Sequence, residues 1–191
     1  MYNNYMFPAI FLDRDGVVIE NKTDYVRNWS QVNFYPDAIH ALSNLKLMTY
    51  KIVVVTNQSA VGRGIISLET ANDINNRLVH TIHNLGGQID SVYLCPHGPN
   101  DECECRKPKP GLLMQAAKEL SLDLKRSWMI GDAWSDIQAG QAAGVHMTIM
   151  VKTGRGTDQL SMPKPTNVTE FLVRANLSQA IDFILTNGYK E

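Results

Sequence analysis

Short apolar runs alternate with helix-like segments along the chain, and this alternation constrains the fold more than any other feature. The runs that predict buried strands span residues 10–12, 52–55, 91–94, 128–130 and 145–151. The segments whose apolar residues recur at helical spacing are 36–48, 67–85, 110–120, 136–143 and 177–185. Strands that alternate with helices are typical of a parallel sheet with helices on both faces. We therefore predict an α/β fold: a three-layer, doubly wound, Rossmann-like parallel sheet.

The remaining segments give no sign of a second unit. The 191 residues fit one domain with a substantial core. Residues 20–35 are polar and residues 152–165 are rich in Gly, Pro and Lys, as surface loops are. No internal repeat or linker interrupts the pattern. We expect a single domain over residues 1–191, without a large cap domain.

The composition argues against several classes of partner. Charged residues make up 19% of the chain and the formal net charge is −1, which gives no general attraction to nucleic acid or to an acidic membrane. No apolar run approaches the roughly 20 residues that span a bilayer, and residues 1–5 lack the pattern of a signal peptide. We expect a cytoplasmic monomer that binds neither nucleic acid nor membranes.

Carboxylates follow two of the expected strands. Asp13 and Asp15 come directly after residues 10–12, and Asp132 follows residues 128–130. Because the carboxyl ends of parallel strands form the ligand crevice, these acids are expected to meet at one edge of the sheet. An Asp pair also occurs in ordinary turns. Carboxylates gathered from separate strands, however, suit Mg²⁺, and we predict a Mg²⁺ site at Asp13, Asp15 and Asp132.

Further polar residues accompany these acids. Thr56 and Asn57 follow the second strand and can donate hydrogen bonds to phosphate oxygens, although Thr-Asn is also a common turn pair. Lys107 lies in the basic run 106–111 and would balance a phosphate dianion, although most basic runs are solvated loops. Asp136 is expected at the start of a helix, where the helix dipole favours a carboxylate, rather than on the metal.

A second metal site is predicted in the loop 95–105. All three cysteines of the chain lie there, and Cys95, His97, Cys103 and Cys105 provide three thiols and an imidazole within eleven positions. The odd number of cysteines argues against a disulfide framework and for a metal in a reducing compartment. Unrelated thiols are the alternative. Four such ligands fill a tetrahedral Zn²⁺ site, which is typical of a structural role.

These motifs together resemble those of the haloacid dehalogenase superfamily, whose phosphatases use an aspartate nucleophile. The resemblance runs from about residue 8 to residue 156. The motifs that carry it are Asp13-Arg14-Asp15-Gly16, Thr56-Asn57-Gln58, Lys107, and Gly131-Asp132 with Asp136. It implies an enzyme that hydrolyses phosphate monoesters with the help of Mg²⁺, and a small phosphorylated sugar as its substrate.

The resemblance also implies roles for single residues. Asp13 would be the nucleophile, and Asp15 would protonate the leaving oxygen and then activate water. Mg²⁺ would be held by Asp13, Asp132 and the backbone carbonyl of Asp15. The residues implied in binding phosphate or the rest of the substrate are Thr56, Asn57, Gln58, Ser59, Arg106 and Lys107.

The cysteine loop narrows the resemblance to a zinc-bearing branch of the superfamily. This branch contains the heptose bisphosphate phosphatases, which serve the synthesis of lipopolysaccharide and other surface glycans, and the histidinol-phosphate phosphatases. The loop 59–64 and Pro110-Gly111 resemble the corresponding segments of the heptose enzymes. We therefore take the heptose type as the main hypothesis. The five residues between His97 and Cys103 are nearer the histidinol-phosphate type, which is the alternative.

Other features leave the substrate open. Ala133 stands where heptose enzymes often carry a lysine. Arg106, Lys109 and Arg63 are candidates for binding the second phosphate of a bisphosphate, although Lys109 and Arg63 are equally well explained as solvated charges. An alternative of another class is a zinc-stabilised interaction module without catalysis. The intact set of mutually repelling acids argues against that alternative.

Overall fold

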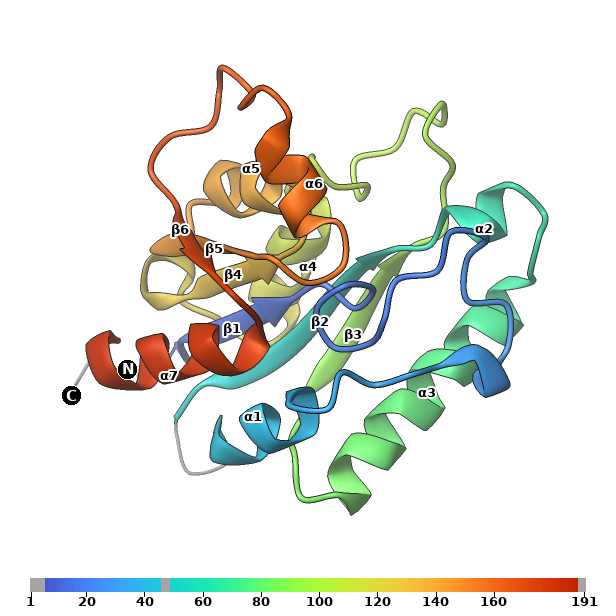
Figure 1. Cartoon of the computed structure of the whole chain (residues 1–191). Helices are drawn as coiled ribbons and strands as arrows, with labels where there is room; N and C mark the ends of the chain where they lie inside the picture. Colours follow the sequence, from blue (N-terminus) through green and yellow to red (C-terminus); the bar gives the residue numbers. More distant parts are fainter. Residues whose placement is uncertain (1–5, 46–48, 189–191) are drawn as a thin grey trace, which may run out of the picture.

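The computed structural model describes residues 6–45 and 49–188, which build a single parallel sheet with its helices (Figure 1). The strands are β1 (Ala9–Leu12), β2 (Lys51–Asn57), β3 (Ser91–Cys95), β4 (Trp128–Gly131), β5 (Met147–Val151) and β6 (Leu172–Arg174). Their order across the sheet is β3-β2-β1-β4-β5-β6, and every neighbouring pair is parallel. The predicted doubly wound fold is therefore confirmed.

Helices connect most of these strands. They are α1 (Ala38–Asn44), α2 (Ser59–Gly62), α3 (Leu68–Asn84), α4 (Gly111–Glu119), α5 (Trp134–Ala143), α6 (Gly156–Ser161) and α7 (Leu177–Asn187), with 3₁₀ turns at Trp29–Gln31 and Leu124–Arg126. Within the described ranges, none of these helices combines the length and the apolar character that crossing a bilayer requires. The longest segments without an α-helix lie between β1 and α1 and between β3 and α4, and both reach the same edge of the sheet (Figure 1).

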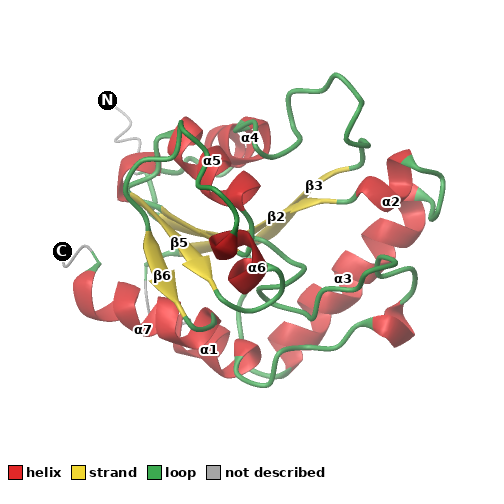
Figure 2. Cartoon of the chain, turned by 45° about the horizontal axis from the view of Figure 1, so that its top comes forward, coloured by secondary structure: helices red, strands yellow, loops and turns green. Residues whose placement is uncertain are grey.

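The helices cover both faces of the sheet and so complete the three layers (Figure 2). Helices α1, α3 and α7 pack on the face that receives Ile10 and Leu12, and α4 and α5 pack on the face that receives Ala9 and Phe11. Neighbouring side chains of a strand point to opposite faces, so a strand covered on both sides is apolar throughout. Burial of each large apolar side chain contributes about 1.5–3 kcal/mol, which anchors β1 at the centre.

Local signals set the ends of the longer helices. The Ser67 hydroxyl accepts a hydrogen bond from the Thr70 N–H at 3.0 Å and caps α3, as the sequence predicts. Asn176 caps α7 in the same way through the N–H of Gln179. Helix α5 ends at Gly144, whose φ of +79° is in the left-handed region that glycine adopts without strain.

Three elements were not predicted, and each is short. Strand β6 has three half-buried residues at the edge of the sheet, so it lacks the continuous apolar run that marks a central strand. Helices α2 and α6 have four and six residues, which is too few to show helical periodicity. Helix α6 lies inside the segment 152–165, which the sequence predicts as an irregular loop.

Some predicted boundaries also shift. Strand β5 begins at Met147 rather than at residue 145, because the His146 N–H donates to the carbonyls of Leu124 and Ser127 instead of joining the sheet. Helix α5 begins two residues before the predicted start, at Trp134. In the predicted helix 36–48, Met48 lies outside the described residues.

The topology brings the predicted acids to one place. The chain winds from β1 through β2 to β3 on one side and then returns to β4 on the other side of β1. In such sheets the ligand crevice lies where the winding direction changes, beyond the carboxyl ends of the strands. Leu12 pairs with Ile130 across β1 and β4, so the residues that follow these two strands begin side by side.

Candidate active site

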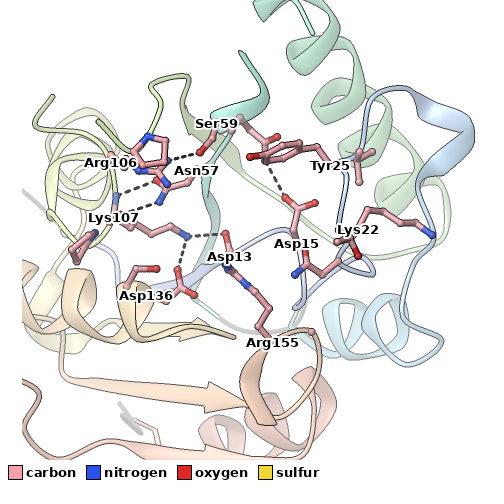
Figure 3. A pocket seen from close by; sticks show the side chains of 18 residues that line it. Asp13, Asp15, Lys22, Tyr25, Asn57, Ser59, Arg106, Lys107, Asp136 and Arg155 are labelled. Carbon is pink, nitrogen blue, oxygen red and sulfur yellow. Dashed lines mark hydrogen bonds and ion pairs between the residues drawn. The ribbon is translucent and has the colours of Figure 1, made fainter. Parts of the chain in front are cut away.

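A pocket of about 760 Å³ opens at this edge of the sheet (Figure 3). Its walls come from the loop after β1, from the end of β2 and the start of α2, from the loop between β3 and α4, from the start of α5, and from the loop after β5. Asp13 and Lys107 lie at its floor, where both side chains are almost completely buried. The pocket therefore joins motifs that lie far apart in the sequence.

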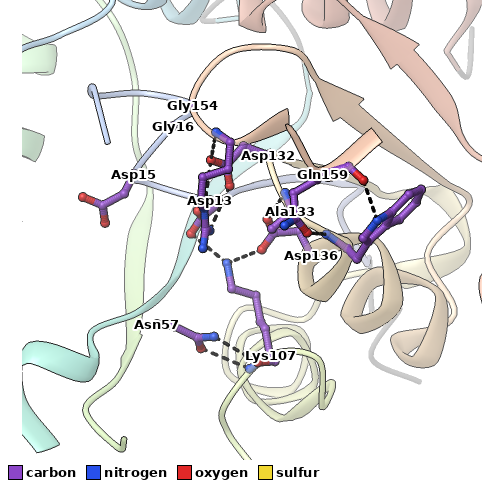
Figure 4. A network of polar contacts seen from close by, with 12 residues as sticks. Asp13, Asp15, Gly16, Asn57, Lys107, Asp132, Ala133, Asp136, Gly154 and Gln159 are labelled. Atoms are coloured by element: carbon purple, nitrogen blue, oxygen red, sulfur yellow. Dashed lines mark hydrogen bonds and ion pairs between the residues drawn. The ribbon is translucent and has the colours of Figure 1, made fainter. Parts of the chain in front are cut away.

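Three buried carboxylates meet beside this floor (Figure 4). Asp13, Asp132 and Asp136 each offer an oxygen, and these oxygens lie within 4.8 Å of one another. The sequence predicts Asp13 and Asp132 here, whereas Asp136 was expected to serve only the helix end. Asp136 does accept a hydrogen bond from the Ala133 N–H at 3.0 Å at the start of α5, but its carboxylate also belongs to this cluster.

Close backbone approaches hold the three acids together. The Asp13 N–H donates to the Ile130 carbonyl at 2.9 Å, which ties the end of β1 to β4. Gly16 has a φ of +92°, and a Cβ at this position would overlap the carboxylate of Asp132. The turn that follows the strand therefore requires glycine, because any side chain would displace the acid.

Lys107 neutralises part of this negative charge. Its Nζ lies 2.7 Å from Oδ1 of Asp13 and 2.7 Å from Oδ1 of Asp136, and it also donates to the Val55 carbonyl (Figure 4). Burial alone would lower the pKa of Lys107, but the two carboxylates outweigh it and raise the pKa above its ordinary value. The lysine is therefore protonated at neutral pH.

The pKa values of the neighbouring acids move in the direction expected for crowded carboxylates. Burial raises the pKa of Asp136, with Lys107 opposing and Asp13 adding to the increase. Burial and the charge of Asp13 raise the pKa of Asp132, and Arg155 opposes this increase. A single lysine and a single arginine thus leave the cluster short of positive charge. Its oxygen donors fit a divalent cation such as Mg²⁺, which prefers carboxylate ligands.

Asn57 lines the pocket and also fixes the position of Lys107. Its amide oxygen accepts from the Lys107 N–H at 3.1 Å, and its amide nitrogen donates to the Lys107 carbonyl at 3.0 Å (Figure 4). The sequence predicts Asn57 as a phosphate ligand. The contacts show a residue at the end of β2 that holds the lysine-bearing loop in register.

Asp15 lies apart from the buried carboxylates, on the pocket side of the same turn. Arg14 holds it with contacts of 3.0–3.2 Å, and the Gln58 amide donates to it at 3.0 Å. Arg14 is itself buried and donates to Asn75 of α3 at 2.7 Å. The side chain of Asp15 is therefore absent from the carboxylate cluster, so any contribution to a Mg²⁺ site would come from its backbone.

The remaining predicted substrate ligands divide into two groups. The Thr56 hydroxyl is buried and accepts from the Gln58 amide at 2.8 Å, so both residues serve Asp15. Ser59 and Arg106 line the pocket and bond to each other at 2.8 Å.

Two predicted cations do not face the pocket. Lys109 donates to the carbonyl of Cys103 and pairs with Glu104 on the outer side of the loop between β3 and α4. Arg63 is exposed beyond α2, and neither residue lines the pocket.

Arg155 is the residue that the sequence reasoning missed. Its backbone N–H donates to Oδ2 of Asp132 at 2.8 Å, and its guanidinium pairs with Oδ1 at 3.1 Å. It stands just before α6, in a segment predicted as a surface loop, and it lines the pocket. A Gly-Arg-Gly sequence in a loop after the last long strand was the available signal, and the topology makes that loop part of the crevice.

The four predicted zinc ligands do come together. The sulfur of Cys95 lies 3.1 Å from that of Cys105, 3.8 Å from that of Cys103 and 3.5 Å from Nδ1 of His97. Two thiolates on one tetrahedral zinc ion are separated by about 3.8 Å, so the arrangement fits that ion. Burial, followed by the neighbouring Cys105 thiol, raises the pKa of Cys95 to about 12, and this thiol keeps its proton unless a metal ion replaces it.

Comparison with known proteins gives a consistent result. Residues 104–175 match the HAD-hydrolase-like family model. The D-glycero-β-D-manno-heptose-1,7-bisphosphate 7-phosphatase of Pseudomonas aeruginosa is 34% identical over 172 residues, which cover 90% of this chain and 96% of the relative. The enzyme of the same name from Pasteurella multocida is 40% identical over 156 residues, or 78% of this chain and 84% of the relative.

The chain belongs to the heptose bisphosphate phosphatase family. This family lies within the haloacid dehalogenase superfamily, as the sequence motifs predict. A solved structure supports the same assignment: the D,D-heptose 1,7-bisphosphate phosphatase of B. bronchiseptica, complexed with magnesium and phosphate, superposes with a TM-score of 0.88 at 31% identity. The superposition covers 95% of this chain and 99% of that enzyme.

Proposed function

We propose that this chain removes the 7-phosphate from D-glycero-β-D-manno-heptose 1,7-bisphosphate in a Mg²⁺-dependent reaction. The observation that carries the proposal is the placement of Asp13. Its carboxylate lies at the floor of the pocket, 2.7 Å from a buried lysine and within 4.8 Å of two further acids. The relatives of that name support the choice of substrate.

The cation is proposed to lie on Asp13, Asp132 and the backbone carbonyl of Asp15. When bound, it supplies positive charge that offsets the repulsion between a carboxylate nucleophile and a phosphate dianion. The crowded, buried carboxylates support this assignment, because their charge exceeds what the neighbouring cationic side chains neutralise. Asp136 is proposed to keep Lys107 in place.

In the proposed first step, a carboxylate oxygen of Asp13 attacks phosphorus and the bond to the 7-oxygen of the sugar breaks. Asp15 transfers its proton to that oxygen, so the sugar leaves as an alcohol and Asp13 carries the phosphoryl group. Lys107 supplies a fixed positive charge beside the reacting carboxylate. Gln58 and Arg14 hold Asp15 toward the pocket while it transfers the proton.

In the proposed second step, Asp15 acts as a base. Its carboxylate takes a proton from a water molecule whose oxygen attacks phosphorus, and the bond between phosphorus and Asp13 breaks. Inorganic phosphate leaves, Asp13 is again a carboxylate and Asp15 is again protonated. Arg106, which lines the pocket beside Ser59, is proposed to bind the second phosphate of the substrate.

We also propose that Zn²⁺ occupies the cluster Cys95, His97, Cys103 and Cys105. A closed site with four protein ligands leaves no position for substrate, so its role would be structural. Arg106 and Lys107 directly follow Cys105 in the chain. An ordered loop would therefore place both cations at the pocket.

Phosphate release tests the proposal most simply. Initial rates are compared for heptose 1,7-bisphosphate and for histidinol phosphate, each with and without Mg²⁺. We expect hydrolysis of the bisphosphate to require Mg²⁺ and to be at least about a hundredfold more efficient, because pocket groups built for a second phosphate would remain unpaired with histidinol phosphate.

A preference for histidinol phosphate would overturn the proposed substrate and favour the alternative suggested by the short spacing of the zinc loop. No phosphate release from either ester would instead support an interaction module without catalysis. Because the proposed site is built from one chain, we also propose that the monomer is active. Activity in the monomer fraction from size-exclusion chromatography checks this.

A further inference from the structure

The cationic side chains around the pocket differ in how firmly they are engaged. Lys107 is buried between two carboxylates, and Arg106 donates both to Ser59 and to the carbonyl of His97. Arg155 is different, because its side chain is 52% exposed and, within the described part of the chain, its guanidinium is hydrogen-bonded only to Asp132. Among the pocket cations beside the buried carboxylates and on the loop between β3 and α4, it is therefore the one most readily available to a bound anion; Lys22, which pairs with Glu20 at 3.9 Å, lines the pocket from the loop after β1.

The backbone around Arg155 is fixed independently of its side chain. The Thr153 hydroxyl donates to the Gly16 carbonyl at 2.6 Å, and the Gly154 N–H donates to the Tyr35 hydroxyl at 2.9 Å. A Cβ at Gly154 would overlap both Asp132 and the Gly16 backbone. These contacts clamp the loop after β5 onto the loop after β1, so the arginine begins from a defined point at the pocket wall.

Asp132 does not depend on the guanidinium of Arg155. Its Oδ2 already accepts the Arg155 backbone N–H at 2.8 Å, which no change of side chain removes. A divalent cation on Asp132 would repel the guanidinium that lies 3.1 Å from Oδ1. The arginine would then need another anionic partner, and its flexible stem can turn toward the pocket.

The charge of the proposed substrate supplies such a partner. Each phosphate ester carries about −1.5 to −2 charges at neutral pH, so a bisphosphate brings two anionic ends. Asp13 and Lys107 lie where the first phosphate would react. Arg106 reaches the pocket from the loop between β3 and α4 and Arg155 from the loop after β5, so both guanidinium-bearing residues line the pocket that holds Asp13 (Figure 3).

We propose that Arg155 is a specificity-determining residue that binds the second, non-reacting phosphate of the substrate together with Arg106. The planar guanidinium suits bidentate contact with phosphate oxygens. Ala133 at the start of α5 carries no charge. Arg155, on the neighbouring loop after β5, would supply the positive charge there instead. This inference rests on the proposed function, because it requires a substrate with two phosphates.

Steady-state kinetics with two substrates test the inference. Arg155→Ala is compared with the unaltered chain on heptose 1,7-bisphosphate and on heptose 7-phosphate, which lacks the second phosphate. We expect KM for the bisphosphate to rise about tenfold to a hundredfold, because one charge-assisted contact is lost. KM for the monophosphate should change less than about twofold. For Arg155→Lys, which keeps a point charge, we expect a KM for the bisphosphate between that of the unaltered chain and that of Arg155→Ala.

Arg77→Ala is the matched control. Arg77 has a 56% exposed side chain that also pairs with a single aspartate, Asp73, but it lies on α3 outside the pocket. We expect no change with either substrate in this variant. Equal losses on both substrates in Arg155→Ala would overturn the inference, because they would mean that the arginine only orders Asp132.

Binding measurements provide a readout that does not depend on turnover. Isothermal titration calorimetry with heptose 1-phosphate, the product that keeps the second phosphate, should show at least tenfold weaker binding to Arg155→Ala in Mg²⁺. Titration with Mg²⁺ alone should show unchanged or tighter binding, because a competing cation has been removed. Unchanged affinity for heptose 1-phosphate, or weaker binding of Mg²⁺, would overturn the inference.

The proposed function and this inference fail in different ways. If the unaltered chain hydrolyses neither heptose ester, the proposed function is wrong. If it hydrolyses the bisphosphate normally and Arg155→Ala loses activity equally on both esters, only the inference is wrong.

Discussion

At the scale of single residues, Asp15 shows how a proposed acid and base is kept in place. Arg14 contacts it from one side and the Gln58 amide from the other. Gln58 is in turn fixed by the Thr56 hydroxyl. Thr56 and Gln58, which follow β2, therefore support Asp15, which follows β1. The chemistry proposed for Asp15 thus depends on the neutral amide of Gln58, which is not hydrogen-bonded to Asp13.

The first prediction concerns Gln58→Leu. This variant keeps most of the side-chain volume but removes the donor to Asp15, so we expect kcat to fall about tenfold to a hundredfold through loss of one hydrogen bond to a charged group. Steady-state kinetics measure the effect. Gln115→Leu removes a similar amide contact, to Glu119 on the surface of α4, and should leave kcat unchanged. Normal turnover in Gln58→Leu would show that Asp15 needs no such support.

The second prediction concerns the ion pairs of Lys107 with Asp13 and Asp136. Lys107→Met leaves Asp13 and Asp136 buried without their shared cation, which should lower the free energy of unfolding by about 3–5 kcal/mol. The double variant Lys107→Met/Asp136→Asn removes one of the two charges and should regain part of that stability without regaining activity. Urea unfolding without added Mg²⁺ measures the first effect and phosphate release the second. Recovery of activity in the double variant would remove Lys107 from the mechanism.

At the scale of elements, β2 and β3 are joined at their beginnings by a half-buried carboxylate. Asp90 accepts from the Ile52 N–H at 2.8 Å, from Lys51 at 2.9 Å and from Gln88 at 2.9 Å. Burial alone would raise the pKa of Asp90, but these hydrogen bonds outweigh it and lower the pKa below 3.8. The charged form is thus part of the native structure.

The third prediction follows from this lowered pKa of Asp90. A carboxyl group whose pKa is lower in the folded state stabilises the fold above the unfolded pKa, 3.8, and loses this contribution as the pH falls through the native pKa. Asp90→Asn should therefore cost about 1 kcal/mol at neutral pH, and the difference should shrink below about pH 4. Urea unfolding across this range measures it. Asp73→Asn, at an exposed pair on α3, is the control, and a constant difference at all pH values would contradict the assignment.

The fourth prediction concerns the loop between β3 and α4. Cys95 ends β3 and the other three ligands of the proposed zinc site lie in this loop, at the margin of a core that is otherwise built from strands and helices. Removal of zinc by a chelator, followed by Mg²⁺ in excess, should abolish most activity while far-ultraviolet circular dichroism stays nearly constant. Metal analysis before chelation should find about one zinc ion per chain. Full activity without zinc would show that the loop positions Arg106 and Lys107 unaided.

At the scale of the whole molecule, the winding of the sheet accounts for the position of the site. The acids of β1 and β4 are more than a hundred residues apart in the sequence, yet they meet because β1 lies between β2 and β4. Packing on both faces holds this edge in place. Repulsion among the acids is tolerated because the surrounding core contributes far more stability than their repulsion removes.

The fifth prediction tests this balance between the repulsion among the acids and the stability of the surrounding core. Saturating Mg²⁺ should raise Tm by about 5–10 °C, since a ligand at a hundred times its Kd contributes about 2.7 kcal/mol to a protein of this size. Asp132→Asn removes a proposed ligand and should reduce the shift strongly, as thermal denaturation will show. An equal shift in the variant would place the cation elsewhere.

Much of this arrangement is predictable from the sequence, for identifiable reasons. Long apolar strands such as residues 52–55 and amphipathic helices such as residues 67–85 carry strong periodic signals. The four proposed zinc ligands lie within eleven consecutive positions, so their proximity needs no knowledge of the fold. The topology rule then places Asp13 beside Asp132.

The rest depends on contacts that no local pattern encodes. Arg155 is marked only by a glycine on each side, and its role arises from a loop that packs across the carboxyl end of β1. The use of Asn57 as a support for Lys107 depends on the distance between the end of β2 and the loop that carries Lys107. Strand β6 is defined by pairing with β5 rather than by its own composition.

The central claim, that Asp13 accepts the phosphoryl group, is tested by chemical trapping. The enzyme is quenched during turnover of heptose 1,7-bisphosphate, reduced with borohydride, digested and examined by mass spectrometry. Borohydride converts an aspartyl phosphate to homoserine, so we expect homoserine at position 13 and an unmodified Asp15. Homoserine at another position, or an unmodified Asp13 in samples that release phosphate at the normal rate, would contradict it.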